Sequence, residues 1–157
     1  MLENINIRTA SPQESSLIAK HIYVMWQDIG VPKDSLQSNC LEITKEYIDN
    51  ARQQLFYQAF LADINNTIIG SVSCQILPDL YPNILKPEYR KQGYIWGVYV
   101  EPDYRRQGIA KKLMGEAITY LKSLSCTQVV LHASPQGKFL YPHLGFYENN
   151  EMRLDLW

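Results

Sequence analysis

Apolar residues recur at helical spacing in three stretches of the chain. In each stretch they return every three to four positions, which places them on one face of a helix. The predicted helices run from Pro12 to about Trp26, from Ser38 to Arg52 and from Gly108 to Leu124. The first start is supported by Ser11-Pro12, a serine N-cap followed by proline at the first helical position. We therefore expect three amphipathic helices.

Extended segments lie before, between and after these helices. β-Branched, aromatic and alternating apolar residues predict strands at 5–9, within 55–76, at 94–100 and at 129–133. Asn65-Asn66-Thr67 interrupts 55–76 and predicts a hairpin turn. A short helix over 135–144 and closing strands from Phe146 onward, including 152–156, complete the expected order.

Residues 77–93 predict a long loop. The segment contains three prolines, which argue against regular structure, and two tyrosines. Loops of this length inside a compact domain often serve function. We therefore expect this loop to take part in a binding site.

Composition narrows the class of protein. The chain has 157 residues, 46% of them hydrophobic and 20% charged, with a formal net charge of −1. This size predicts a single domain over residues 1–157 that needs neither disulfides nor a metal ion. A near-neutral charge argues against a nucleic-acid partner. No apolar run reaches the roughly 20 residues that span a membrane, and MLENINIRTA lacks the features of a signal peptide, so we expect a cytoplasmic protein.

The three cysteines predict no metal site. Cys40, Cys74 and Cys126 are far apart in the sequence and lack the close spacing of a zinc or redox pair. Free cysteines are commonly buried as small apolar residues, and we expect the same here. A catalytic thiol is the alternative.

Residues 98–110 form the most informative segment. A strong strand, Tyr94–Val100, turns through Glu101-Pro102-Asp103 into a helix whose first turn holds Gly108 and Ala110. Because a helix N-terminus offers unpaired N–H groups and a positive dipole, this junction predicts a phosphate site. The P-loop pattern GxxxxGK[ST] and the dinucleotide pattern GxGxxG are both absent. An ordinary strand–turn–helix junction is the alternative.

Two motifs resemble one enzyme superfamily. Arg105-x-x-Gly108-x-Ala110, after Val-x-Val-x-Pro, is similar to the acetyl-CoA motif of the GNAT N-acetyltransferases, Arg/Gln-x-x-Gly-x-Gly/Ala. Residues 131–146, LHASPQGKFLYPHLGF, resemble the second motif of that family, which ends in Leu-Tyr-x-x-x-Gly-Phe. The order of predicted elements agrees with the family over nearly the whole chain. The resemblance implies an α/β fold with a mixed central sheet of six to seven strands flanked by about four helices.

The resemblance also implies acetyl-CoA as co-substrate and no metal. In the family, a bulge separates the strand corresponding to 94–100 from its neighbour, and the freed backbone binds pantetheine. Many members carry asparagine where Ser134 stands and alanine where Gly137 stands, and the Ser134 hydroxyl could donate in place of the asparagine. The implied cofactor-binding residues are Val98, Val100, Arg105, Arg106, Gln107, Gly108, Ile109, Ala110, Ser134 and Tyr141.

Amine acetylation needs a proton donor and a proton acceptor. By resemblance, Tyr141 matches the tyrosine that protonates the sulfur of coenzyme A, and a phenol can serve as this general acid. Three residues are candidates for the general base: Glu101, His132 and Glu88. Glu101 directly follows the cofactor strand, His132 carries an imidazole suited to proton transfer near neutral pH, and Glu88 lies in the proline-rich loop.

We expect the first two helices and the 77–93 loop to form the site that binds the acceptor amine. An aromatic pocket with one acidic group would suit a cationic amine. The candidate residues are Trp26, Asp28, Tyr81, Tyr89 and Trp96, with ordinary core and surface positions as the alternative.

The leading hypothesis is direct acetyl transfer to an amine in a ternary complex. The alternative is a catalytically idle acyl-CoA-binding, sensing or interaction module. The acceptor is left open between small-molecule and peptide amines, and the sequence is compatible with a homodimer without specifying one. Nucleic acid and membrane are not expected partners.

Overall fold

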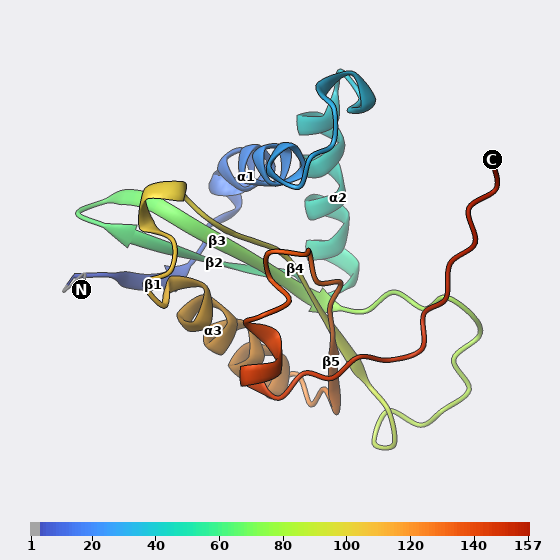
Figure 1. Ribbon diagram of the computed structural model, residues 1–157. Helices are drawn as coiled ribbons and strands as arrows, with labels where there is room; N and C mark the ends of the chain where they lie inside the picture. Colours follow the sequence, from blue (N-terminus) through green and yellow to red (C-terminus); the bar gives the residue numbers. More distant parts are fainter. Residues whose placement is uncertain (1–3) are drawn as a thin grey trace.

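The computed structural model describes residues 4–157, arranged around one five-stranded sheet (Figure 1). The strands follow one another across the sheet in chain order: β1 (Asn6–Thr9), β2 (Gln58–Ile64), β3 (Thr67–Ile76), β4 (Gln92–Val100) and β5 (Gln128–Val130). Neighbours from β1 to β4 are antiparallel, and β5 runs parallel to β4. The sheet is therefore mixed, which confirms the predicted fold class.

Helices cover both faces of the sheet. Figure 1 shows α1 (Ser15–Asp28) and α2 (Cys40–Gln54) on one face and α3 (Ile109–Ser123) on the other. Between α3 and the sheet, Leu113 and Leu121 are buried with Val72. Between α1, α2 and the sheet, Ile18 and Ile48 form a second apolar cluster. These two layers confirm the three amphipathic helices.

A row of polar side chains on β3 lies buried beneath α1 and α2. Ser71, Ser73 and Gln75 are completely buried, and each has a hydrogen-bonding partner. The Ser71 hydroxyl lies 2.7 Å from His21 Nδ1, the Ser73 hydroxyl lies 2.8 Å from the Tyr57 hydroxyl, and Gln75 bonds Tyr47 and Trp96. Because an unpaired buried polar group is costly, this row constrains how the helices sit on the sheet.

β4 contains a bulge at Gly97. Ser71 pairs with Tyr99 while Ser73 pairs with Trp96, so Gly97 and Val98 together face a single residue of β3. Gly97 has φ +65°, the left-handed conformation that glycine adopts in this type of bulge. A Cβ at this position would lie 2.4 Å from Cδ1 of Ile22 on α1. The bulge therefore needs glycine both for its backbone and for its close approach to α1.

Gly97→Ala is expected to lower the free energy of unfolding by about 2–4 kcal/mol, because left-handed strain and overpacking both contribute. Chemical denaturation measures the change. Gly30→Ala is the matched control, since Gly30 also has a positive φ, +104°, but nothing within 4 Å of its Cβ position. Equal decreases in the free energy of unfolding in the two variants would show that the contact with Ile22 does not contribute to the effect of Gly97→Ala.

β4 and β5 separate soon after they begin to pair. Their ladder consists of Gln92 with Gln128, Gly93 with Val129, and Tyr94 with Val130. Beyond Tyr94 the two strands diverge, so within residues 4–157 no strand pairs with the remainder of β4 on that side. A gap therefore opens toward the carboxyl ends of both strands, between β4 and the segment that follows β5.

The carboxyl-terminal part differs from the prediction. The sheet has five strands rather than six or seven, and three α-helices rather than about four. Instead of a helix over 135–144, only a 3-10 turn forms at Tyr141–Leu144, where Pro142 lacks a backbone donor and Gly145 ends the turn with φ +90°. The closing strands from 146 onward are absent within the described residues, because that segment has no neighbour to complete a backbone ladder. The strand expected at 129–133 ends at Val130.

Part of the amino-terminal stretch assessed for a signal peptide, residues 1–3, lies outside the described residues. Within residues 4–157, no helix combines the length and the apolar character needed to cross a membrane.

Candidate active site

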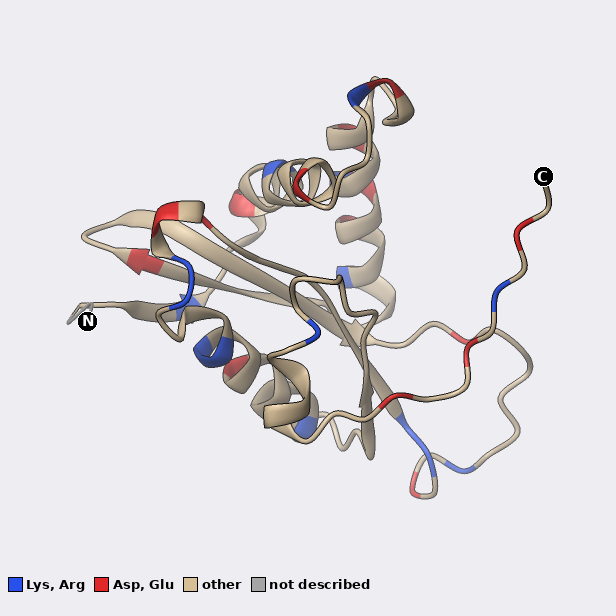
Figure 2. Cartoon of the chain, viewed as in Figure 1, with Lys and Arg blue, Asp and Glu red and all other residues tan. Residues whose placement is uncertain are grey.

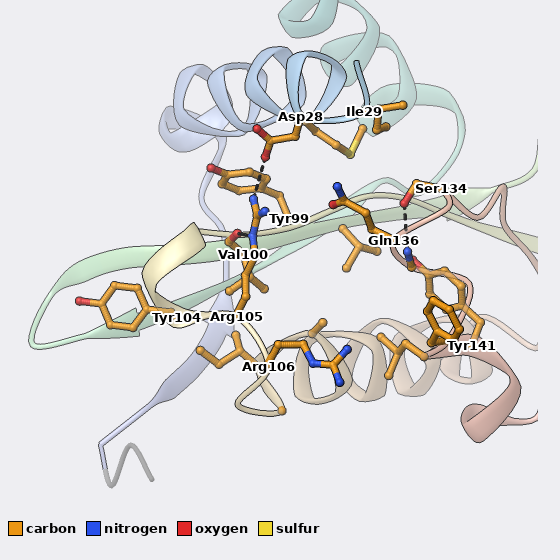
Figure 3. A pocket seen from close by; sticks show the side chains of 18 of the residues that line it. Asp28, Ile29, Tyr99, Val100, Tyr104, Arg105, Arg106, Ser134, Gln136 and Tyr141 are labelled. Atoms are coloured by element: carbon orange, nitrogen blue, oxygen red, sulfur yellow. Dashed lines mark hydrogen bonds and ion pairs between the residues drawn. The ribbon is translucent and has the colours of Figure 1, made fainter. Parts of the chain in front are cut away.

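A cleft of about 420 Å³ opens between the end of α1, the second half of β4, the start of α3 and the segment after β5 (Figure 3). Ten of the residues singled out by sequence contribute to its wall. These are Asp28, Val98, Val100, Arg105, Arg106, Gly108, Ile109, Ala110, Ser134 and Tyr141. Of the expected cofactor-binding residues, only Gln107 is not part of the lining.

The turn before α3 presents free backbone amides to this cleft. Arg106 and Gly108 both have positive φ, +63° and +82°, and Gly108 is the N-cap of α3. Within residues 4–157, no protein acceptor is found for the amides of residues 106–111. Nothing lies within 4 Å of the Cβ position of Gly108. Successive free amides at the positive end of a helix make a site that fits a phosphate group.

Basic side chains surround the same turn. Figure 2 shows Lys and Arg along the loop before α3 and on its first turns, where the sequence contains Arg105, Arg106, Lys111 and Lys112. A local positive potential therefore accompanies the free amides despite the net charge of −1.

The exposed side of β4 offers further backbone groups. The Glu101 N–H donates to the Ile69 carbonyl on β3 (2.8 Å). Because backbone groups alternate in direction along a strand, those of Val100 point the other way, into the gap. The Val100 carbonyl accepts from Arg105 Nε (2.7 Å). The Val100 N–H faces the gap and is available to a ligand. This arrangement fits an extended chain carrying amides, laid along β4.

Arg105 joins β4 and α1 beside the cleft. In addition to its bond to Val100, its Nη2 donates to Asp28 Oδ2 at 2.7 Å, and its guanidinium lies 5.5 Å from the centre of the Tyr99 ring (Figure 3). The Arg105 side chain is thus engaged with protein partners at the end of α1. The charge of Asp28, expected to attract a cationic amine, is already paired.

Tyr141 lies at the opposite end of the cleft, near Ser134 (Figure 3). Its ring meets Phe146 edge to face at 5.8 Å. A Cβ on Gly137 would lie 3.0 Å from the Tyr141 ring, so glycine lets the loop approach it. Burial raises the pKa of Tyr141, which keeps the phenol protonated. The Ser134 hydroxyl accepts from the Gly137 N–H (3.2 Å) and retains its own proton for donation.

Glu101 belongs to a cluster on the α1 side of the sheet. Its carboxylate accepts a hydrogen bond from the Tyr99 hydroxyl (3.2 Å) and lies 3.8 Å from Nε2 of His21. The His21 ring is almost completely buried, and its centre is 4.6 Å from that of Tyr99. Burial lowers the pKa of His21, while Glu101 opposes this and Lys20 adds to it. His21 is therefore neutral at pH 7.

The lowered pKa of His21 predicts acid sensitivity. The unfolded chain binds a proton near pH 6.5 more readily than the folded one, so the free energy of unfolding falls as pH drops below about 6.5. Titration of one group changes the free energy of unfolding by at most about 1.4 kcal/mol per pH unit. Urea denaturation between about pH 7 and 5.5 should show a smaller fall in His21→Gln than in the parent chain, whereas the exposed His143→Gln should follow the parent. A parent stability that is flat in this range would contradict the assignment.

The other candidate bases, like Glu101, lie outside the cleft lining. His132 is exposed, with Nδ1 3.0 Å from the Tyr94 hydroxyl and Nε2 3.1 Å from Oε2 of Glu151. It follows β5 by two residues and contacts the last β4 residue of the ladder, so it lies where the gap between the strands closes. Glu88 is exposed in the loop.

The five residues expected to form an acceptor pocket are not brought together. Trp96 packs against Tyr47 and Tyr57 under α2, Tyr81 accepts from Arg90 at a second cavity formed by the loop, and Tyr89 is exposed. Asp28 is at the cleft, and Trp26 is about half exposed on α1. The loop therefore builds a separate hollow rather than a wall of the main cleft.

A family model described as the acetyltransferase (GNAT) family matches residues 23–146 of the chain. This match includes both motifs and runs from the last turns of α1 to the turn after β5. The chain belongs to the GNAT family. The match confirms the resemblance stated from Arg105-x-x-Gly108-x-Ala110 and residues 131–146.

Individual GNAT relatives act on different kinds of amine. The chain is 31% identical to a glucosamine 6-phosphate N-acetyltransferase of Trypanosoma brucei brucei, over 67% of this chain and 69% of that protein. It is 29% identical to human N-alpha-acetyltransferase 30, over 62% of this chain but only 29% of that protein. The chain thus spans less than a third of the length of that second relative.

A solved GNAT structure has the same fold. A predicted acetyltransferase from Clostridium acetobutylicum, determined with acetyl-CoA, superposes with a TM-score of 0.81 over 97% of this chain and 95% of that one, at 24% identity.

Several cleft residues of this GNAT chain were missed by sequence reasoning. Each motif marked its own segment, but apart from Asp28, which was expected at the acceptor site, α1 carried no signal that its last turn would face the turn before α3. The missed residues are Met25, Ile29, Tyr99, Tyr104, Gln136, Gly137, Phe139, Leu140 and His143. Those at 136–143 lie inside the second motif and could have been included from it.

Proposed function

We propose that this chain transfers the acetyl group of acetyl-CoA to a primary amine by direct attack in a ternary complex. The observation that carries the proposal is the continuous path from the free amides at 106–111 into the gap beside β4. The amide turn suits the diphosphate of coenzyme A, and the free side of β4 suits the amides of pantetheine. Family membership supports the same reading.

In this proposal, Gly108 and Ala110 allow close approach to the diphosphate, and Arg106 adds positive charge. Val98 and Val100 bind the pantetheine arm through their backbone. Arg105 does not bind the cofactor directly in this proposal; its side chain positions Val100 and Asp28 through hydrogen bonds. A thioester at the end of this arm lies toward the closed end of the gap, near Tyr94 and Val130.

Tyr141 is the proposed general acid. Amine attack breaks the bond between carbonyl carbon and sulfur, and the departing thiolate needs a proton, which the Tyr141 hydroxyl supplies. Its raised pKa keeps that proton available at neutral pH. The phenolate then regains a proton from water.

His132 is the proposed general base. Of the three candidates, it lies next to the closed end of the gap, whereas Glu88 is in the distant loop and Glu101 is engaged with Tyr99 and His21. Glu151 orients the ring from its other nitrogen. His132 would take up the proton that the amine loses on forming the amide and release it to solvent.

The proposed acceptor is a primary amine on a small molecule or a peptide. The two relatives named above act, by their names, on an amino sugar phosphate and on protein α-amines. A panel containing amino sugars, polyamines, aminoglycosides and short peptides covers this range.

Titration calorimetry with acetyl-CoA and detection of released thiol across the amine panel test the proposal together. Saturable binding with turnover of at least one amine is the expected result. Binding without turnover would support the idle acyl-CoA-binding module instead. Absence of binding would overturn both readings of the cleft.

A further inference from the structure

The connection between β3 and β4, residues 77–91, borders a second cavity that the proposed acetyl transfer does not use. Its volume is about 300 Å³, at the small end of the range for sites that bind small molecules. The wall is formed by this connection, by Leu55 after α2, and by the adjoining ends of β3 and β4. No residue of this wall also lines the main cleft, so a ligand bound here would leave the cofactor cleft open.

Much of the wall is apolar, and hydrogen bonds fix both ends of the connection. Leu55, Ile76 and Leu77 contribute to the wall together with Pro87. The Ile76 N–H donates to the Leu55 carbonyl (2.9 Å), and the Leu77 N–H donates to the Gln92 carbonyl (2.9 Å). Because proline fixes its own φ, Pro87 restricts the connection further. The cavity is therefore formed before a ligand arrives, and its wall suits an apolar body.

Arg90 brings a guanidinium group to this cavity. Its Nη2 donates to the Tyr81 hydroxyl (2.9 Å), and its guanidinium carbon lies 6.0 Å from the centre of the Tyr81 ring. Among residues 4–157, no carboxylate forms an ion pair with Arg90, although Asp79 and Glu88 belong to the same connection. A guanidinium group has five N–H donors, so several remain for a ligand.

The charge of the wall is positive overall. Arg90 and Lys91 supply two cations, and Asp79 supplies the one carboxylate. Lys91 Nζ donates to the Leu124 carbonyl after α3 (2.7 Å), so Lys91 contributes positive potential rather than a direct contact. Figure 2 shows Lys and Arg where the connection enters β4. An arginine without a carboxylate partner, beside apolar surface, fits an anionic group carried on an apolar body.

We propose that this cavity binds a small organic acid, with its anionic group on Arg90 and its apolar body against Leu55 and Leu77. The Tyr81 hydroxyl accepts from Arg90 and retains its own proton for donation to the same anion. Burial of the apolar body favours binding, and the paired hydrogen bonds of the guanidinium orient the acid. The proline-rich connection, whose length predicts a functional role, then has a ligand of its own.

Fluorescence titration of the full chain with anilinonaphthalene sulfonate, an anionic aromatic probe, tests the proposal. Excess coenzyme A is included to keep the probe out of the main cleft. We expect saturable binding, with a Kd raised by about 10-fold or more in Arg90→Gln and unchanged in Lys86→Gln. Lys86 is the matched control, because it is an exposed cation of the same connection that is not part of the cavity wall. The uncharged probe phenylnaphthylamine should bind the parent chain and Arg90→Gln equally.

Amide chemical shifts locate the sulfonate probe and verify the fold of each variant. Residues 77–92 should shift in the parent chain when the probe is added. Shifts confined to the turn at 106–111, or to any other surface, would overturn the proposal. Absence of saturable binding would overturn it as well, and so would equal affinity of the parent chain and Arg90→Gln for the sulfonate probe.

Competition with octanoate and with phenylpropanoate distinguishes two sources of the acid. Displacement of the sulfonate probe by octanoate alone identifies an aliphatic acid, displacement by phenylpropanoate alone identifies an aromatic acid, and displacement by both identifies a cavity that accepts either body. Displacement by neither acid at millimolar concentration would contradict the proposal. None of these outcomes depends on whether the chain transfers acetyl groups.

Discussion

Tyr141→Phe is expected to lower kcat by about 10²–10⁴-fold, the usual contribution of a general acid, and to leave the Kd for acetyl-CoA nearly unchanged. The substitution removes one hydroxyl and keeps the ring that packs against Phe146 and Gly137. The fold and cleft shape are therefore preserved. Steady-state kinetics with an amine from the panel gives kcat, and calorimetry gives Kd.

Tyr120→Phe is the matched control. Tyr120 is also a partly buried tyrosine with a pKa raised by burial, but its hydroxyl donates to the Phe56 carbonyl in the connection between α2 and β2, and Tyr120 is not part of the cleft lining. Its loss should leave kcat unchanged. Since the pKa of Tyr141 lies above its ordinary value of about 10, any loss of activity from its ionisation should appear only above about pH 10. Wild-type kcat in Tyr141→Phe would remove the assigned acid.

Gly108→Trp is expected to raise the Kd for acetyl-CoA by at least about 100-fold. Space at the Cβ position is open, so an indole is accommodated by the folded domain and occupies the place where a diphosphate would meet the free amides. The folded state loses about 1–2 kcal/mol from left-handed strain, because Gly108 has φ +82°. Calorimetry measures the affinity, and thermal unfolding verifies the fold.

Gly145→Trp is the matched control, which distinguishes obstruction of the cleft by the indole from backbone strain. Gly145 has φ +90° and nothing within 4 Å of its Cβ position, but it is not part of the cleft lining. Both variants should lose similar stability, and only Gly108→Trp should lose affinity. A tryptophan at 108 that binds acetyl-CoA normally would show that the diphosphate lies elsewhere.

The proline-rich loop and the tail show where local pattern is insufficient. Residues 77–93 have aromatic residues suited to a pocket, yet they build a separate cavity with Leu55 and Ile76. Residues 152–156 alternate as a strand should, yet no neighbour within the described chain completes the ladder. A strand exists only with a partner, so alternation alone cannot determine whether it forms.

The sequence by itself determined the helices, the central strands and the turn before α3, because these depend on short-range properties. Helical spacing marks one buried face, β-branched and aromatic runs favour extended backbone, and Gly108 permits the left-handed turn that frees the amides. The motif residues around this turn and around Tyr141 are likewise defined by short local patterns.

Only the tertiary structure decided how these parts meet. The separation of β4 from β5, the bonding of Arg105 to Asp28 across 77 positions, and the burial of His21 beside Ser71 and Glu101 all join residues distant in sequence. Such contacts depend on how the helices pack over the sheet, which no local spacing encodes. A chain of near-neutral charge therefore presents a cluster of free backbone amides that suits an anion, which composition does not count and folding alone brings to one cleft.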